Sequence, residues 1–357
     1  MNHRGYLKVG KERLGKVTKL EGAELDALYE EVRRIRNQVN HEGLDSLEGY
    51  WLKTSRISAY FRRNNQVNHE EIVNYLTKAL KGKEFQDPSG VVHLQGNNVA
   101  ILNIYDIHLD KLPREHQLTY SAENYLNQLK QIVISLIQEA SQIYYIDTVV
   151  FPVGGDLFNT NGFNSATKKG TPQQVLFDHS VAFKLGTEFI VYIVDYLVSK
   201  GYKVELPVIY GNHDHDADFY LGALLEVYYK NSSMVKVNNN LVVRKYLSYG
   251  TTMFGFGHGD VEKSKVTILP MIMATEQPEM WAKTKHRVFY LGDIHHKQEI
   301  KFLRLKDYPG CTVSFLRSVG VEDQWSHDNM FLGTPRTLEL HVYNNERGNV
   351  CNLMRNL

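Results

Sequence analysis

Five apolar runs along the chain each end in a short polar segment, a pattern that predicts buried strands followed by tight loops. The runs are Val99–Tyr105, Ile146–Val153, Val204–Tyr210, Thr251–Phe256 and Arg287–Leu291. Most of the polar segments contain glycine, which lets the backbone turn sharply. In open α/β sheets such loops gather at the carboxyl ends of the strands, where ligands bind. We therefore predict an α/β fold in which the polar segments meet at one edge of a sheet.

Other segments repeat apolar residues at every third or fourth position, the spacing of one helical face. This spacing predicts helices over Ser121–Ala140, Val175–Val198 and Asp216–Lys230. Gly201 is expected at the C′ position that ends the second of these helices. Met271–Thr284 is expected to cap the edge of the site.

Domain boundaries follow from composition. A Pro/Gly/Ser cluster at Phe85–Gly90 marks the end of a first region. We predict a helical, basic accessory region over residues 1–90 and a core domain over residues 91–300. Residues 301–357 are expected to form short strands that complete a second sheet.

The pattern of the first 90 residues predicts short helices, and two interpretations of their role remain open. Gly22–Asn40 and Glu70–Leu80 have helical spacing, and between them Gly43–Asn65 mixes aromatic with basic residues. Short helices with basic, aromatic turns would fit a small DNA-binding module of helix-turn-helix type. Alternatively they form an appendage that packs on the core or mediates assembly, since no motif identifies a recognition helix.

Composition narrows the class of protein. The 357 residues include 41 Lys and Arg against 40 Asp and Glu, so no global positive field points to nucleic acid. The two cysteines form no C-x-x-C pair, which argues against a disulfide scaffold or structural zinc and favours a reducing compartment. No apolar run approaches the ~20 residues that span a bilayer, and the N-terminus lacks the apolar segment of a secretory signal. We expect a cytoplasmic protein with no membrane contact.

The five polar segments supply the ligand types of a divalent-metal site. They are Asp106-Ile107-His108, Gly154–Asn159, Tyr210–Asp214, Gly257–Asp260 and Gly292–His296. Carboxylate, amide oxygen and imidazole, without thiolate, suit Mn²⁺, Mg²⁺ or Fe²⁺. Asp156 can bridge two ions, because a carboxylate has two oxygens whereas one imidazole nitrogen binds one metal. Two such ions would activate a bound water molecule as a nucleophile.

The motifs D-x-H, G-D-x-x-N, G-N-H-D, G-H-G and G-D-x-H, in this order, resemble those of the calcineurin-like metallophosphoesterase superfamily. The most similar branch is the SbcD-type DNA exonucleases, which include versions carried by phages. The resemblance implies a metallophosphoesterase β-sandwich flanked by helices, with residues 91–300 as its catalytic core, and two divalent ions. Mn²⁺ is the first expectation, with Mg²⁺ or Fe²⁺ next. The implied ligands of the first ion are Asp106, His108, Asp156 and His295, and those of the second are Asp156, Asn212, His258 and Asp293.

One ligand departs from the family pattern, since the last motif usually reads G-H-x-H and here reads Gly292-Asp293-Ile294-His295. Aspartate is a hard ligand that adds negative charge and would favour Mn²⁺ or Mg²⁺ over Zn²⁺. Alternatively Asp293 points away and the second ion binds weakly. His296 is an alternative to His295 as a ligand, although His295 keeps the family spacing.

The resemblance also implies roles in catalysis. His213 would face the phosphate and stabilise or protonate the leaving oxygen. Asp214 would orient the His213 imidazole and keep it cationic enough to donate a proton. Asn159 and Trp325 are further candidates for substrate contact, and Trp325 would either stack on a base or belong to the core.

These features together predict a metal-dependent phosphodiesterase, in first place a DNA nuclease of exonuclease or structure-dependent endonuclease type. DNA is the expected partner, and an ATPase partner or a homodimer is a further expectation. A small-molecule phosphatase or cyclic-nucleotide phosphodiesterase is the first alternative. A binding scaffold that lost its metals is the second, and the retention of all but one of the family's ligand residues argues against it.

Overall fold

The structure of the chain is a computed structural model. It describes Glu30 and residues 49–53, 58–62, 85–114, 121–293, 305–328 and 335–357, and every structural statement below concerns these residues. The chain divides into two compact units. The smaller comprises Met1–Val67 with Gln174–Leu176, and the larger comprises Asn68–Gln173 with Phe177–Leu357.

The larger unit contains a seven-stranded sheet formed by β3 (Asn98–Asn103), β4 (Ile146–Val150), β5 (Val153–Gly154), β6 (Lys203–Ile209), β7 (Val235–Asn238), β13 (Thr337–Asn344) and β14 (Gly348–Asn356). Strands β3, β4 and β6 pair in parallel, and β5 and β7 both run parallel to β6. Strand β13 pairs antiparallel with β3, and β14 pairs antiparallel with β13. The sheet is therefore parallel at its centre with an antiparallel edge.

A second sheet has five strands, which are β8 (Lys245–Tyr249), β9 (Thr252–Gly257), β10 (His286–Leu291), β11 (Leu305–Tyr308) and β12 (Cys311–Phe315). Strand β10 lies between β9 and β12 and is parallel to both. Strands β8 and β11 are antiparallel edge strands. The segment after residue 300 thus completes both sheets, because β11 and β12 join this one while β13 and β14 join the other.

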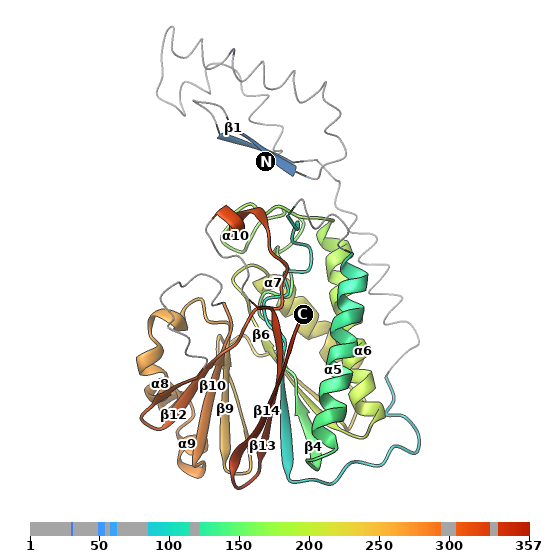
Figure 1. Ribbon diagram of the computed structural model, residues 1–357, viewed down its shortest axis with the longest axis vertical. Coiled ribbons are helices and arrows are strands. Elements are labelled where there is room, and N and C mark those ends of the chain that lie inside the picture. Colours follow the sequence, from blue (N-terminus) through green and yellow to red (C-terminus); the bar gives the residue numbers. More distant parts are fainter. Residues whose placement is uncertain are drawn as a thin grey trace. The chain divides into compact units, whose positions relative to one another are not determined.

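The two sheets pack face to face (Figure 1), and the buried side chains between them form one cluster. Val99 and Ile101 of β3 share a buried cluster with Phe254 of β9 and Tyr290 of β10. The intervening residues of β3 point to the opposite face and join the cluster beneath the helices. Successive strand residues face opposite sides of a sheet, so each central strand contributes to two cores.

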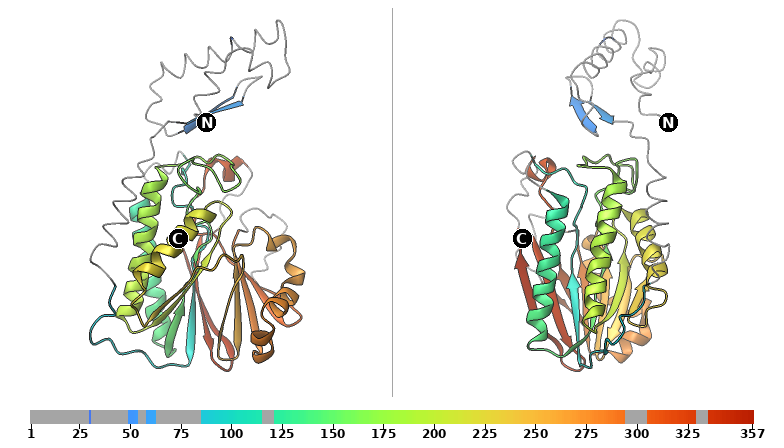
Figure 2. Two further views of the ribbon diagram at one scale, coloured as in Figure 1. Left: turned by 180° about the vertical axis from the view of Figure 1, so that it is seen from behind. Right: turned by 90° about the vertical axis from the view of Figure 1, so that its right-hand side faces the viewer.

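Helices cover the outer face of each sheet (Figure 2). Those on the seven-stranded sheet are α5 (Ala122–Ser141), α6 (His179–Ser199) and α7 (His215–Tyr228). Those on the five-stranded sheet are α8 (Leu269–Glu276) and α9 (Pro278–Lys283), preceded by the short 3₁₀ turns η3 (Glu262–Ser264) and η4 (Val266–Ile268). The short helix α10 (Gln324–Asp328) lies between β12 and β13. None of the described helices is both long enough and apolar enough to cross a bilayer.

The predicted α/β sandwich flanked by helices is confirmed, as are the five strands that precede the polar segments. The second predicted helix begins at His179 rather than Val175, because Asp178 occupies the N-cap, a position that aspartate favours. Gly201 follows the C-cap residue Lys200 and has a φ of 90°, so it is the predicted C′ glycine.

The prediction for Met271–Thr284 was wrong about its place. Leu269 and Met273 of α8 pack with Phe289 and Val313 on the outer face of the five-stranded sheet, and Trp281 of α9 packs against them. The segment covers a core instead of bordering the site, because its apolar side chains find a larger apolar surface on the sheet.

The smaller unit differs from the predicted helical region in one segment. Strands β1 (Gly49–Lys53) and β2 (Ser58–Arg62) form an antiparallel pair, with Gly49 opposite Arg62 and Lys53 opposite Ser58. Aromatic residues such as Trp51 and Phe61 favour strands, and this preference prevails here. Glu30 is helical, as predicted for Gly22–Asn40. The remainder of that helix and the helix predicted over Glu70–Leu80 lie outside the described residues.

Candidate metal centre

The loops that follow β3 and β5 are joined by a ladder of backbone hydrogen bonds. The N–H of Asp106 donates to Gly155 O at 3.2 Å, and the N–H of His108 donates to Asp156 O at 2.9 Å. The Leu109 N–H then donates to Leu157 O at 2.9 Å. The ladder extends strand-like pairing beyond the sheet and fixes the first two predicted motifs side by side.

The loops after β6 and β10 join the same group through side-chain carboxylates. Asp156 Oδ1 accepts from the backbone N–H of His213 at 2.9 Å. Asp106 Oδ2 accepts from the backbone N–H of Asp293 at 3.1 Å. Two of the predicted ligands therefore organise the loops that carry the others.

The backbone is strained at the predicted ligands. Among described residues other than glycine, positive φ values occur at Asp106 (55°), His108 (48°), Asp156 (63°), Asp293 (49°) and Ser165 (42°). The left-handed region disfavours residues with a Cβ, and such conformations persist where surrounding structure enforces them. Four of the five residues are predicted metal ligands, so the strain is concentrated at the centre.

Two groups of side chains could each hold a metal ion. Asp106, Asp156 and His258 form one group, and His108, Asp156 and His213 form the other, with ligating atoms in each group within 4.8 Å of one another. Asp106, Asp156 and His258 are at most 2 % exposed. Asp156 belongs to both groups, as expected of a bridging ligand.

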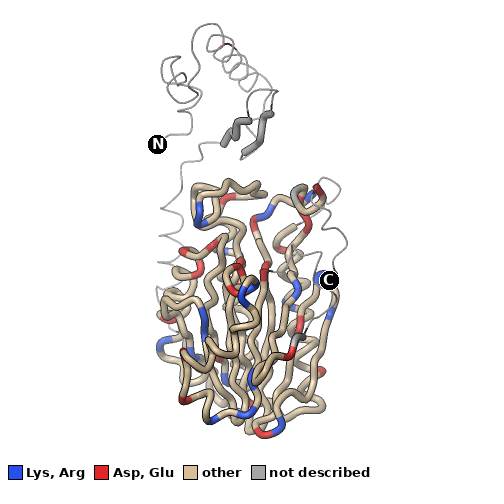
Figure 3. The backbone as a smooth tube through the Cα atoms, turned by 90° about the vertical axis from the view of Figure 1, so that its left-hand side faces the viewer, with Lys and Arg blue, Asp and Glu red and all other residues tan. Residues whose placement is uncertain are grey.

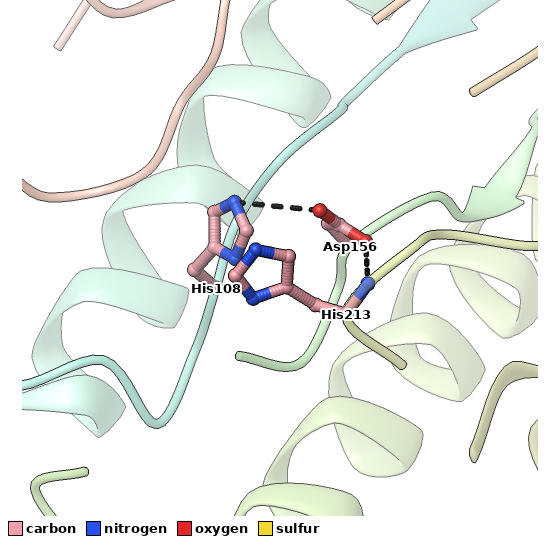
Figure 4. A group of neighbouring side chains, drawn as sticks. All are labelled: His108, Asp156 and His213. Atoms are coloured by element: carbon pink, nitrogen blue, oxygen red, sulfur yellow. Dashed lines mark hydrogen bonds and ion pairs between the residues drawn. The ribbon is translucent and has the colours of Figure 1, made fainter. Parts of the chain in front are cut away.

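The second group comes from three loops (Figure 4). The His108 and His213 rings lie edge to face with centroids 4.7 Å apart. His108 Nε2 lies 3.8 Å from Asp156 Oδ2. The arrangement differs from the implied ligand set, because His213 takes a place beside His108 and Asp156.

Asn212 also reaches the centre. Its side-chain Oδ1 lies 2.7 Å from His258 Nε2, which is itself 3.3 Å from Asp156 Oδ2. An amide oxygen only accepts, so His258 Nε2 carries the proton in this arrangement. His258 thus contacts both Asn212 and Asp156, and all three are implied ligands of the second ion.

The charges at the centre stabilise one another. Burial alone would raise the pKa of Asp156, but the imidazoles of His258, His213 and His108 outweigh it and hold that pKa below its usual value. Burial would lower the pKa of His258, but Asp156 and then Asp106 raise it to about 10. A carboxylate that stays ionised when buried needs a nearby cation. Protonated His258 is that cation in the protein without bound metal.

Asp293 has a cationic partner that the sequence did not suggest. Its Oδ2 lies 2.5 Å from the Nζ of Lys263 on η3. The carboxylate therefore lies in an ion pair at the border of the centre and outside the two candidate metal groups. His295 and His296 lie outside the described residues, so the choice between them stays a prediction.

Asp214 orients a different group from the one predicted. Its Oδ2 accepts from the Phe158 N–H at 2.8 Å and its Oδ1 from the Asp156 N–H at 3.2 Å. The His213 ring is instead oriented by the backbone carbonyl of Asn159, 3.1 Å from its Nδ1. The prediction that Asp214 orients the imidazole is thus corrected, because the αL turn at Asp156 presents two amide donors to this carboxylate.

The other two candidates for substrate contact are Asn159 and Trp325. Asn159 is 2 % exposed, and its backbone carbonyl contacts His213, while the predicted substrate contact of its side chain stays a prediction. Trp325 belongs to α10, and its side chain lies outside the described part of the chain. Its predicted role stays a prediction.

A second buried carboxyl group, that of Asp218, forms a hydrogen bond with Asp214. Asp218 of α7 accepts from the Gly211 N–H at 2.9 Å and shares a hydrogen bond with Asp214. Burial, and then the charges of neighbouring carboxylates, raise the pKa of Asp214 to about 8 and hold that of Asp218 well above its usual value. A Cβ at Gly211 would overlap the carboxylates of Asp156 and Asp214, so only glycine fits above this pair.

The residues present fit a divalent metal. The donors are carboxylate, amide and imidazole groups without thiolate, which suits Mn²⁺, Mg²⁺ or Fe²⁺. They converge from separate loops, are largely buried, and are held by backbone hydrogen bonds and carboxyl groups behind them. Such supporting contacts are typical of built metal sites.

Comparisons with known proteins add little to this geometry. No protein-family model matches the sequence, and no curated protein matches it. Among solved structures, Vps29 from Chaetomium thermophilum is 12% identical, with 72% of this chain and 95% of that chain covered and a TM-score of 0.27. A hypothetical protein from Thermus thermophilus is 13% identical, with 73% of this chain and 98% of that chain covered and a TM-score of 0.27. Both likenesses are too weak to bear on function.

Proposed function

We propose that this protein is a metal-dependent phosphodiesterase of the calcineurin-like metallophosphoesterase superfamily, and that DNA is its substrate. The convergence of Asp106, Asp156 and His258 from three separate loops is the observation that supports the proposal most directly. A cluster of buried hard donors at the carboxyl ends of parallel strands is the arrangement expected of a ligand site.

Divalent cations bound to these residues would activate a water molecule and neutralise the charge of the phosphodiester. The donors favour Mn²⁺, with Mg²⁺ or Fe²⁺ as alternatives. Asp156 would hold both ions, since it belongs to both candidate groups.

His213 would donate a proton to the leaving oxygen. Its Nδ1 faces the carbonyl of Asn159, which can only accept, so Nδ1 keeps its hydrogen. Nε2 is therefore the ring nitrogen that can give a proton to substrate. Proton donation matters most for an alkoxide, because an alkoxide is a poor leaving group.

DNA as the substrate rests on the order and spacing of the motifs. One feature of the structure agrees with a polymeric substrate. The loop that follows Asn159 carries the exposed Lys168 and Lys169, and it is fixed to α7 by hydrogen bonds between Asn161 and Asp216. In the view of Figure 3, Lys and Arg of the larger unit are interspersed with Asp and Glu.

The test is to incubate the protein with Mn²⁺ and labelled single- or double-stranded DNA, and in parallel with bis(p-nitrophenyl) phosphate. Cleavage of DNA that EDTA abolishes supports the proposal. Hydrolysis of the small ester alone would support a small-molecule phosphodiesterase instead. Inertness together with an absence of Mn²⁺ binding would overturn metal-dependent hydrolysis altogether.

A matched pair of variants controls for folding. Asp156→Asn removes a carboxylate from both candidate metal groups and is expected to abolish cleavage. Asp195→Asn changes a partly buried carboxylate on α6 that accepts from Tyr229 Oη at 2.8 Å, and is expected to retain it.

A further inference from the structure

A buried series of hydrogen bonds lies behind His213, and none of the predicted metal ligands takes part in it. Asp110 is fully buried, and its Oδ1 accepts from the Asn159 N–H at 2.7 Å. Its Oδ2 accepts from the hydroxyl of Thr160 at 2.8 Å. The backbone carbonyl of Asn159 then lies 3.1 Å from His213 Nδ1. Asp110 is thus linked to His213 through a single intervening residue.

Thr160 is held from its other side by His179. The Thr160 hydroxyl lies 3.0 Å from His179 Nδ1, and because it donates to Asp110 it must accept from the imidazole. His179 is the first residue of α6 and packs among the rings of Phe158 and Phe183. These hydrogen bonds therefore anchor residues 159 and 160 to the long helix α6.

The geometry points to Asp110 as a positioning residue for His213. This inference rests on the proposed function, in which His213 protonates the leaving oxygen. Asn159 begins the loop that runs to Pro172, and its carbonyl alone orients the His213 ring among the hydrogen bonds of the described residues. A carbonyl at the start of a long loop needs an anchor, and two hydrogen bonds to one buried carboxylate supply it.

The test uses two phosphodiesters that differ in the leaving group. An oligonucleotide releases an alkoxide that needs a proton, whereas bis(p-nitrophenyl) phosphate releases p-nitrophenolate unaided. Asp110→Asn keeps the side-chain shape but replaces one of the two accepting oxygens with an NH₂ donor, so one of the two hydrogen bonds is lost. We expect its kcat on the oligonucleotide to fall about 10-fold to 100-fold, with KM unchanged and kcat on the activated ester within about twofold.

The double variant with His213→Ala provides a second readout. If Asp110 acts through His213, the double variant is no slower than His213→Ala alone, because coupled residues are not additive. Thr160→Val, which removes the hydroxyl bridge, is expected to give a weaker form of the same pattern, and Thr160→Ser is expected to restore activity. These variants keep the test decisive if Asp110→Asn folds poorly. Asp195→Asn is the matched carboxylate control and should leave both substrates unaffected.

Equal losses on both substrates, or additive losses in the double variant, would overturn the positioning role and leave the proposed function standing. A wild-type protein that cleaves neither substrate at any metal concentration would overturn the proposed function, and the role of Asp110 with it. Selective loss on the oligonucleotide with no further loss in the double variant supports the inference.

Discussion

Single residues at the centre combine strained backbones with compensated charges. Asp106, His108 and Asp156 have left-handed conformations, and the buried carboxylate of Asp156 stays ionised because imidazoles adjoin it. Strain of this kind costs on the order of 1–3 kcal/mol per residue and persists only where the surroundings enforce it. At this centre, the enforcing contacts are the backbone ladder and the carboxylate–amide hydrogen bonds.

His213 fits two roles. It lies beside His108 and Asp156, where it could bind a metal, and its ring is also oriented as a proton donor. We predict that His213→Ala lowers turnover of an oligonucleotide by about 10²–10⁴, the scale of a lost general acid. Calorimetric titration with Mn²⁺ should give the same stoichiometry as the wild type. A lost metal equivalent would make His213 a ligand.

Lys263 provides a second prediction at this scale. Its ammonium neutralises Asp293, so the Asp293–Lys263 pair contributes no net charge. In this respect the pair resembles the neutral histidine that the family motif usually has at this position. Removing the ammonium leaves the carboxylate uncompensated and should strengthen cation binding. We expect Lys263→Met to tighten the weaker Mn²⁺ site by roughly tenfold.

The control for Lys263→Met is Lys265→Met, which removes the same charge two residues away at an exposed position. Calorimetry should show no change for that variant. Equal affinities in Lys263→Met and the wild type would mean that Asp293 does not contribute to metal binding.

At the scale of elements, the start of α7 supports two loops at once. Asp214, its N-cap residue, accepts from amides of the Asp156 loop, and Asp218 one turn later accepts from the Gly211 N–H. The raised pKa values mean that the folded protein keeps a proton on this pair that the unfolded chain loses near pH 4.

This retained proton predicts how stability depends on pH. Between the unfolded pKa of about 4 and the folded pKa of about 8 the folded state binds more protons, so the free energy of unfolding falls as pH rises. In Asp218→Asn, the amide replaces the protonated acid, and the decline between pH 6 and 9 should be smaller by on the order of 1 kcal/mol. Urea unfolding in EDTA measures it, and parallel curves for wild type and variant would refute it.

Helices and strands followed from sequence to different extents. The five core strands were predictable because each is a continuous apolar run ended by polar residues, which local pattern reveals. In contrast, the local pattern did not predict where Met271–Thr284 packs or that β1 and β2 form a pair. An apolar helical face does not specify which surface it covers, and aromatic–basic segments fit a strand as well as a turn.

For the whole molecule, metal binding should couple to stability. The ligands come from loops that follow strands of both sheets, so an ion bound to them favours the folded state. We expect Mn²⁺ at 100-fold excess over its Kd to add about 2.7 kcal/mol to the free energy of unfolding. Thermal unfolding with Mn²⁺ and with EDTA checks this, and identical Tm values would contradict it.

Metal binding should also release a proton. Asp156 and Asp106 raise the pKa of His258 to about 10, so the imidazole is protonated at neutral pH in the protein alone. A metal ligand must be deprotonated, so binding is expected to release about one proton and to weaken as pH falls. Calorimetry in buffers of different ionisation enthalpy measures the number released. A value of zero would exclude His258 as a ligand.

The sequence by itself determined that five apolar segments become core strands, which loops after them carry donors, and which residue types those loops offer to a metal. These properties are local, since they follow from apolar periodicity and from the side chains next to each strand end. Only the tertiary structure decided that Lys263 pairs with Asp293, that Asp214 binds the Asp156 loop, and that Asp110 supports His213 through the Asn159 backbone. Each of these contacts joins residues distant in sequence, and a buried polar group's partner depends on which donors and acceptors the packed loops place within reach.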